Sequence, residues 1–378
     1  MTVSIRPVLS GADRKAFVDL AWRIYGDDPA WVPPLKSEVH GLIAERGSNP
    51  WFEHGEAAFW LAERDGVPVG RVSAQVDRLV QERRPGLGQW GFFDYVDDPS
   101  VGAALIATAE AWLRGKGMTI AQGPLSLGIW DEPGLLVSGF DTRPTVMMGH
   151  HRAWFERDVL AAGYRGVRDL HAWELDISKP FPPLVQRIVA AGEKGGRIRI
   201  REIDKARFAQ EAALVLSILN EAWSENWGFV PLTDAEVAYV GKKLKPIVFA
   251  DLVRIAEYDG EPVAFMITLP DVNELTADLD GRLFPFGWAK LLWRLRKPKV
   301  SRMRVPLMGV RTHLQGTRAA SMMAFMMIEY IRRASVANYG ATRGEIGWIL
   351  EDNEPMRSIA KAIDSEISRT YRIFEKPL

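Results

Sequence analysis

The chain of 378 residues contains no cysteine. This absence excludes disulfides, thiolate nucleophiles and cysteine-rich metal sites, and it suits a reducing compartment. Lysine and arginine together number 48, as do aspartate and glutamate, so the net charge is zero. Because this balance gives no overall attraction to nucleic acid, we expect no nucleic-acid partner.

Long apolar runs are also missing. No run approaches the ~20 residues that a bilayer-spanning helix needs, and the N-terminus lacks the basic head and apolar core of a signal peptide. We therefore expect a cytoplasmic protein and leave open a peripheral contact with the inner membrane.

The chain does contain an internal repeat. Residues 62–69 (AERDGVPV) return as residues 256–263 (AEYDGEPV), with six of eight positions identical. In each copy an Asp-Gly pair stands between β-prone stretches, which predicts a tight hairpin. Because the chain is too long for one core, we predict two modules, 1–178 and 197–378, joined by a linker at 179–196.

The two modules show the same order of elements. Each is predicted to contain a strand, two helices, a hairpin and then alternating strands and helices that end on a strand. This order indicates an α/β (α+β) fold with a mixed sheet in each module.

The junction between a strand at 304–310 and a long helix at 318–336 is the best candidate for binding chemistry. A loop that opens a helix directs several unpaired N–H groups at one place, and the helix dipole adds positive potential, so such a terminus suits a diphosphate. An ordinary loop entering a buried helix is the alternative. The candidate residues are Met308, Gly309, Val310, Gln315, Gly316, Thr317, Arg318, Ala319 and Ala320.

The matching junction in the first module has the opposite character. Asp97 and Asp98 would repel a diphosphate, and Pro99 lacks an N–H donor. The sequence therefore predicts one diphosphate site, in the second module, and leaves open whether the first module is only a structural partner.

The order of elements resembles the GNAT acyltransferases (GCN5-related N-acetyltransferases), in two tandem copies. GNAT enzymes seat the pyrophosphate of coenzyme A with the pattern Gln/Arg-x-x-Gly-x-Gly/Ala. Gln315 matches its first position and Ala320 its last, while Arg318 replaces the middle glycine. The resemblance implies an acyl-CoA thioester as co-substrate and no metal.

The resemblance also implies catalytic candidates after a strand at 344–350. The amine must lose a proton to a carboxylate or a water chain, and a backbone N–H at the end of the 304–310 strand could stabilise the oxyanion. Base candidates include Glu345, while the family's tyrosine position holds Ala360, for which Tyr371 is the nearest substitute. The catalytic candidates are Glu351, Asp352, Asn353 and Tyr371.

Aromatic segments suggest where an acceptor binds. The insertion 281–299 mixes large apolar residues with lysine and arginine, which suits a lipid interface or a lid over an acyl chain; a solvated helix covering the core is the alternative. In module one, a Gly- and Pro-rich cluster suggests a pocket wall, while adjacent histidines do not suit a metal. The substrate candidates are Trp223, Trp227, Phe286, Trp288, Trp293, Trp348, Asp131, Glu132 and His150.

Four runs sharpen the resemblance: 220–232, 280–293, 344–355 and 370–378 are similar to a bacterial tandem-GNAT family that includes the bacterial ceramide synthases. It implies transfer of a fatty acyl group from long-chain acyl-CoA to the amine of a sphingoid-type base. A small-substrate N-acetyltransferase and a non-catalytic acyl-CoA-binding or lipid-binding protein remain alternatives.

Overall fold

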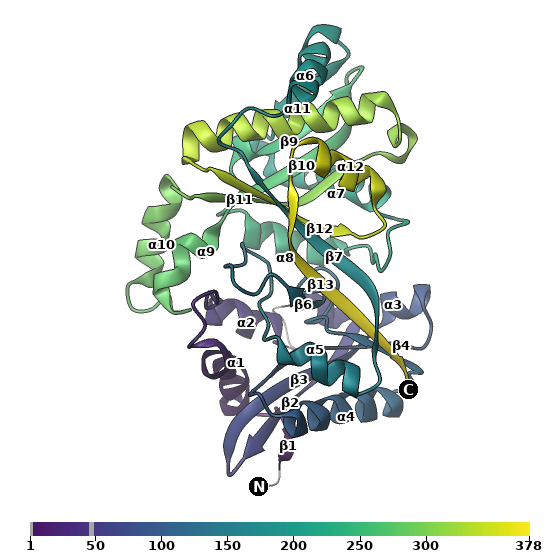
Figure 1. Ribbon diagram of the computed structural model, residues 1–378, viewed down its shortest axis with the longest axis vertical. Helices are drawn as coiled ribbons and strands as arrows, with labels where there is room; N and C mark the ends of the chain where they lie inside the picture. Colours follow the sequence, from purple (N-terminus) through teal and green to yellow (C-terminus); the bar gives the residue numbers. More distant parts are fainter. Residues whose placement is uncertain (1–2, 45–48) are drawn as a thin grey trace. The chain divides into compact units, whose positions relative to one another are not determined.

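The structure, a computed structural model, describes residues 3–44 and 49–378. It divides into two compact units (Figure 1). Unit 1 contains the described residues up to Leu170 together with Thr276–Pro285 and Arg369–Leu378, and unit 2 contains His171–Leu275 and Phe286–Ser368. These bounds are not those of the predicted modules, which follow the order of elements along the chain. Residues 1–2 and 45–48 of the first predicted module lie outside the described residues.

The first half of the chain contains the elements β1 (Ser4–Pro7), α1 (Gly11–Tyr25), α2 (Lys36–Leu42), β2 (Gly55–Arg64), β3 (Val67–Asp77), α3 (Arg78–Arg83), β4 (Leu87–Tyr95), α4 (Pro99–Gly115), β5 (Ile120–Gly123), β6 (Leu135–Ser138), α5 (Trp154–Ala161) and β7 (Arg165–Asp176).

The second half contains α6 (Pro183–Gly195), β8 (Ile198–Glu202), α7 (Phe208–Ala222), α8 (Asp234–Leu244), β9 (Val253–Tyr258), β10 (Glu261–Pro270), α9 (Val272–Thr276), α10 (Gly287–Arg296), β11 (Arg302–Val310), α11 (Arg318–Ala334), β12 (Arg343–Leu350), α12 (Glu354–Ala362) and β13 (Glu366–Pro377). The predicted linker is mostly the helix α6.

Both predicted hairpins are present. Asp65 and Gly66 join β2 to β3, and Asp259 and Gly260 join β9 to β10. All four residues have positive φ, between 52° and 88°, as a tight turn that follows the twist of the strands requires. The sequence repeat therefore marks the same turn in both halves of the chain.

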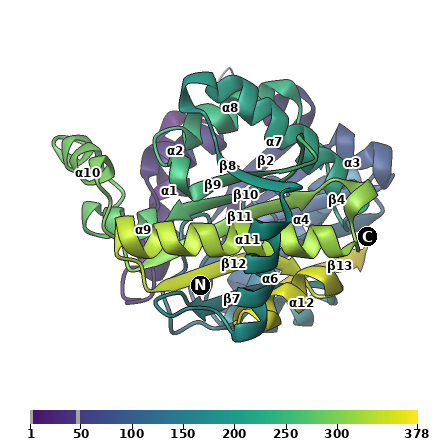
Figure 2. The same ribbon diagram turned by 90° about the horizontal axis from the view of Figure 1, so that it is seen from above.

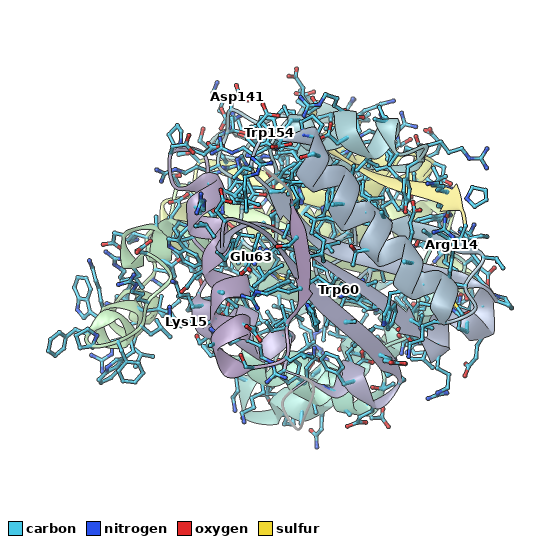
Figure 3. The ribbon with its side chains drawn as sticks, turned by 90° about the horizontal axis from the view of Figure 1, so that it is seen from below. Lys15, Trp60, Glu63, Arg114, Asp141 and Trp154 are labelled. Carbon is cyan, nitrogen blue, oxygen red and sulfur yellow. The ribbon has the colours of Figure 1, made fainter. Side chains whose placement is uncertain are left out.

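Each unit contains a mixed sheet covered by helices, as predicted. In unit 2, α11 lies on one side of strands β9–β11, and α7 and α8 lie on the other (Figure 2). In unit 1, Trp60 of β2, labelled in Figure 3, meets Trp112 of α4 edge to face, with ring centroids 6.3 Å apart.

The closing strand of each predicted module is shared between the units. In unit 1, the end of β13 pairs antiparallel with β5, and Phe374 lies opposite Gly123. In unit 2, the neighbour of β12 is β7, from the first half of the chain. Consequently, Tyr371, Ile373 and Phe374 from the last strand are fully buried in unit 1.

This pairing predicts which unit depends on the last strand. Phe374→Ala should lower the free energy of unfolding by about 3–5 kcal/mol, because it deletes a fully buried ring. Hydrogen exchange should quicken in β4 and β5 and stay unchanged in β11 and β12. The control Ile367→Ala changes a residue that is 45% exposed and should alter stability by less than about 0.5 kcal/mol. Faster exchange confined to β11 and β12 would contradict the pairing.

Candidate functional site

The loop between β11 and α11 lies entirely in unit 2 and is open to solvent. Thr317 caps α11, since its Oγ1 accepts the N–H of Ala320 at 3.2 Å. Gly316 has a φ of +73°, which favours glycine. The first N–H groups of a helix lack intrahelical partners, and in the described chain those of Arg318 and Ala319 have none elsewhere. The N–H of Gly316, in the loop before the cap, has no partner there either. The start of α11 therefore has free N–H groups, and its binding of a diphosphate stays a prediction.

Glu221 of α7 braces this loop. Its carboxylate accepts from Arg311 Nη1 at 2.6 Å and from the backbone N–H of Thr312 at 2.9 Å. The Arg311 hydrogen bond and the Thr312 N–H lower the pKa of Glu221. The Gln315 amide donates to the carbonyls of Val310 at 3.0 Å and Ala222 at 3.2 Å. The structure thus uses the Gln315 amide to hold the loop, while Arg318 is exposed.

Strands β11 and β12 separate next to this loop. Their parallel pairing runs from Arg302 and Arg343 to Val305 and Ile346 and ends there, although β11 continues against β10 to Val310. The divergence leaves main-chain groups of β11 and β12 outside the ladder. We call this region the splay.

Side chains satisfy some of these groups. The fully buried Arg304 donates from Nη2 to the Gly347 carbonyl at 3.2 Å, and its guanidinium carbon lies 4.9 Å from the Trp348 ring centroid. Trp223 Nε1 donates to the Met308 carbonyl at 3.0 Å. Because the N–H and C=O of a strand residue point to the same side, the Met308 N–H also points away from β10, toward the splay.

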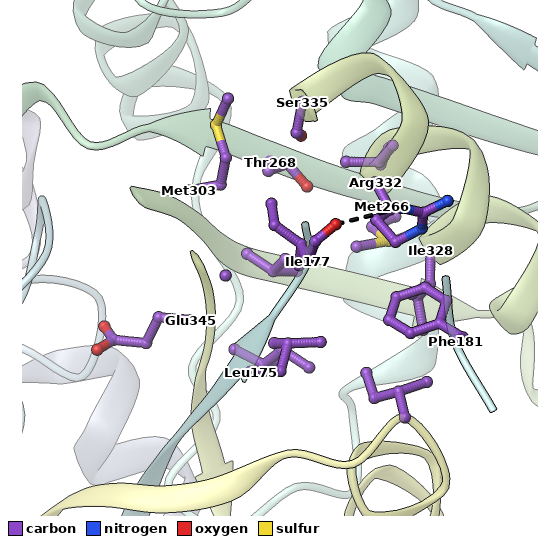
Figure 4. A pocket seen from close by; sticks show the side chains of 15 residues that line it. Leu175, Ile177, Phe181, Met266, Thr268, Met303, Ile328, Arg332, Ser335 and Glu345 are labelled. Atoms are coloured by element: carbon purple, nitrogen blue, oxygen red, sulfur yellow. Dashed lines mark hydrogen bonds between the residues drawn. The ribbon is translucent and has the colours of Figure 1, made fainter. Parts of the chain in front are cut away.

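A small cavity lies deeper in unit 2 (Figure 4). Its volume is about 40 Å³ and its lining is mostly apolar, including Phe181 and Ile328. The hydroxyls of Thr268 and Ser335, two further lining residues, have no partner in the described chain. The cavity has room for a few water molecules, which is far less than a long acyl chain needs.

Unit 1 has a similar divergence that its own chain fills. The parallel pairing of β4 with β5 ends at Gln89 and Gln122. Beyond it, the N–H of Leu125 donates to the Trp90 carbonyl at 2.7 Å. A Cβ at Gly91 would lie 2.0 Å from the Leu125 carbonyl oxygen, so only glycine fits. Residues 124–127 therefore fill the divergence of β4 and β5.

The start of α4 is also unlike that of α11. Asp98 caps α4 by accepting the Ser100 N–H at 2.9 Å, and it pairs with Arg64. Hydrogen bonds from Ser100 and Arg64 lower the pKa of Asp98 to about 2, so it is ionised at neutral pH. Asp97 pairs with Arg157 at 3.0 Å. A helix start that already carries two carboxylates disfavours a diphosphate.

The four predicted catalytic residues do not all belong to the same unit. Glu351, Asp352 and Asn353 form the turn between β12 and α12 in unit 2, while Tyr371 belongs to unit 1. Asn353 Oδ1 caps α12 by accepting the Met356 N–H at 3.2 Å. The buried Tyr371 hydroxyl donates to the Gly149 carbonyl at 2.9 Å. Both therefore have structural tasks, and their catalytic roles stay predictions.

Comparison with known proteins adds full-length relatives, although no family model matches the chain. The chain is 41% identical over 378 residues to the bacterial ceramide synthase of Caulobacter vibrioides (strain NA1000 / CB15N), which covers 100% of this chain and 98% of the relative. It is also 41% identical over 376 residues to Protein YghO of Escherichia coli (strain K12), covering 99% and 95%.

The chain belongs to the bacterial ceramide synthase family. Among solved structures it is similar to a tandem GNAT protein from the clavulanic acid biosynthesis pathway, with a TM-score of 0.57 and 12% identity over 100% of this chain and 98% of the other. It is also similar to a GCN5-related N-acetyltransferase from Sphaerobacter thermophilus, with a TM-score of 0.55 and 13% identity over 99% and 95%. The predicted family and tandem GNAT fold are confirmed.

The predicted substrate residues of this ceramide synthase family member fall into three groups. Trp223, Trp227 and Trp348 belong to unit 2, where Trp223 and Trp348 contact the splay strands. The second group, at the start of α10 and along its surface, is Phe286, Trp288 and Trp293. The third group lies in unit 1 and is Asp131, Glu132 and His150.

Sequence reasoning missed the charged residues that surround this third group. Arg71 of β3 and Asp94 of β4 are buried and form an ion pair at 2.7 Å, and Tyr25 of α1 donates to the same Asp94. No local signal marks them, since β3 also contains Ser73, Gln75 and Asp77 and β4 also contains Gln89. In the described chain, no group of three or more His, Asp or Glu residues could hold a metal, and no described helix could cross a membrane.

The cap of α11 gives a direct test of the loop. Thr317→Ala should lower the free energy of unfolding by about 1 kcal/mol, because the Ala320 N–H loses its acceptor. Thr317→Ser keeps the hydroxyl and should lower the free energy of unfolding by only a few tenths of the loss expected for Thr317→Ala. Urea titrations of the three proteins measure the difference, and equal losses for Ala and Ser would contradict the capping role.

Proposed function

We propose that this chain is an N-acyltransferase that moves a fatty acyl group from acyl-CoA to the primary amine of a long-chain, sphingoid-type base. The observation that carries the proposal is 41% identity over the full chain to a bacterial ceramide synthase. The local geometry supports it, because an open helix start with free N–H groups stands beside two diverging strands in unit 2. The first experiment is an assay of the purified protein with palmitoyl-CoA and a long-chain 2-amino-1,3-diol, following release of free coenzyme A.

In this proposal the donor binds in unit 2. The diphosphate accepts from the N–H groups of Gly316, Arg318 and Ala319, with Arg318 adding a positive charge. The pantetheine arm runs in the splay, where its amides meet main-chain groups outside the ladder. The thioester oxygen then lies near the Met308 N–H, which is a fixed donor for negative charge that develops on it.

The chemistry requires one displacement and two proton transfers. The amine nitrogen attacks the thioester carbonyl carbon, the C–S bond breaks, and the coenzyme leaves as a thiolate that takes up a proton. The nitrogen loses its proton to a carboxylate, for which Glu351 and Asp352 on the turn after β12 are the proposed acceptors. Loss of a general base typically costs 10²–10⁴-fold in rate.

The segment around α10 supports a lipid contact. Phe286 is 77% exposed and Trp293 is 72% exposed, which is unusual for large apolar side chains. Arg296, Lys297 and Lys299 follow directly along the chain. Apolar side chains beside basic ones suit the interface of an anionic membrane. We propose that residues 281–299 make a peripheral contact with such a membrane.

The donor site predicts a specific effect of charge reversal. Arg318→Glu should weaken binding of palmitoyl-CoA about 10- to 150-fold, equivalent to the 1.5–3 kcal/mol of a charge-assisted hydrogen bond. Arg187→Glu is the matched control, because Arg187 is also exposed in unit 2 but lies on α6. Calorimetric titration measures both. Equal affinities of the two variants for palmitoyl-CoA would show that the diphosphate does not bind at the start of α11.

The lipid contact predicts loss of vesicle binding without loss of folding. Replacing both Phe286 and Trp293 with serine should reduce cosedimentation with vesicles of anionic phospholipid at least tenfold, because it removes the exposed apolar groups. Leu184→Ser is the control, since Leu184 is 57% exposed on α6. If the double variant binds vesicles as well as the Leu184 variant does, α10 is not the contact.

A further inference from the structure

Unit 1 contains a polar site that the donor chemistry does not use. At its base, Arg71 donates to Asp94 at 2.7 Å and to the Phe17 carbonyl at 2.8 Å, and Tyr25 donates to the second oxygen of Asp94. These three buried side chains therefore form hydrogen bonds with one another. Two further polar groups lie near them, the Glu132 carboxylate and His151 Nε2, and neither has a hydrogen-bond partner in the described chain.

Hydrogen bonds of the main chain, and none of the carboxylate, hold Glu132 in place. Its carbonyl accepts the Ser126 N–H at 3.2 Å, and nearby the Gly134 N–H donates to the Pro124 carbonyl at 2.8 Å. In the described chain, no side chain or main-chain group bonds its carboxylate. Solvent reaches this side chain, yet surrounding protein atoms raise the pKa of Glu132, and the negative charge of Asp94 adds to the rise while Arg71 opposes it. Because its side chain is exposed and its carboxylate has no partner in the described chain, Glu132 is accessible to a ligand.

His151 presents the complementary group. Its Nδ1 accepts the backbone N–H of Leu136 at 3.1 Å, so in the neutral ring the proton is on Nε2. Burial lowers the pKa of His151 to about 4, so the ring is neutral at physiological pH. No other described residue accepts the Nε2 proton.

Gly149 lies next to both groups. A Cβ at this position would lie 3.1 Å from His151 Cε1 and 3.9 Å from Glu132 Cδ, so these two atoms are no more than about 7 Å apart. The Gly149 carbonyl is held by the Tyr371 hydroxyl at 2.9 Å. The Glu132 carboxyl group and the neutral His151 donor therefore both lie next to a residue without a side chain.

We propose that Glu132 and His151 bind the head group of the acceptor lipid: Glu132 accepts from its ammonium group, and His151 Nε2 donates to an oxygen on the neighbouring carbon. Within the acceptor class already proposed, this pairing favours an amine with an oxygen on the neighbouring carbon over a plain alkylamine. The assignment rests on the proposed acyl transfer, and the two residues act by positioning the amine.

Binding of short, soluble probes tests the assignment without catalysis. The wild type should bind 2-aminooctan-1-ol more tightly than octylamine in calorimetric titrations. Glu132→Gln should weaken both amines at least tenfold. His151→Asn keeps an acceptor for the Leu136 N–H but loses the Nε2 donor, so it should weaken only the amino alcohol, to the level of octylamine. Glu53→Gln, a change at an exposed glutamate of unit 1, should leave both affinities unchanged.

The outcomes separate this site from the proposed reaction. If the wild type transfers palmitoyl groups to an amino alcohol and Glu132→Gln leaves KM for the amine unchanged, the site is wrong and the reaction stands. If amino alcohols bind through Glu132 and His151 but no acyl-CoA is consumed, the site stands and the reaction is wrong. The KM for palmitoyl-CoA should not change in either variant.

Stability gives a second readout, because a binding carboxylate without a partner destabilises the folded chain. The pKa of Glu132 is raised in the folded state, so its ionisation lowers stability as the pH rises from about 4.3, the unfolded value, through the folded pKa. Tyr25, Arg71, Asp94 and His151 face it and are present in both proteins. Glu132→Gln should therefore melt at a higher temperature than the wild type at pH 8 and at the same temperature near pH 4. A lower melting temperature at pH 8 would make Glu132 a structural residue and overturn the proposal.

Discussion

Two parallel strands that diverge must leave main-chain N–H and C=O groups without ladder partners, and this constraint organises both units. A buried polar group without a partner costs about 1–3 kcal/mol, so each divergence needs another source of hydrogen bonds. In unit 2, Arg304 and Trp223 satisfy two carbonyls at the splay. The groups left over are those that an extended, amide-containing ligand can use.

Unit 1 meets the same constraint with its own chain. Residues 124–127 fill the gap after β4 and β5, and buried Gln75 holds them by donating to the carbonyls of Leu125 and Leu127 at 2.5 and 3.1 Å. The filling segment then leads directly to Glu132. Unit 2 therefore keeps a helix start with free N–H groups, and unit 1 fills its divergence with a fixed loop that leads to an unpartnered carboxylate. We interpret this difference as a division of work between donor and acceptor.

The sequence predicted local features well and long-range pairing poorly. Asp-Gly turns and the capped start of α11 depend on residues close in the chain, so their patterns were sufficient. The exchange of β7 and β13 was not predictable, because both closing strands mix apolar and charged residues and this pattern does not specify a partner strand. The hydrogen bond from the Tyr371 hydroxyl to the Gly149 carbonyl was not predictable for the same reason, and the catalytic role of Tyr371 stays a prediction. Arg71 and Asp94 were missed because their ion pair joins two strands whose register the sequence does not reveal.

The central claim is that the open splay of unit 2 and the free helix start of α11 together hold the acyl donor. A crystal structure of the protein with palmitoyl-CoA tests it most directly. The account predicts one coenzyme per chain, with its diphosphate within hydrogen-bond distance of the N–H groups of Gly316, Arg318 and Ala319 and its pantetheine arm between β11 and β12. A coenzyme bound at the start of α4, against Asp97 and Asp98, would contradict it.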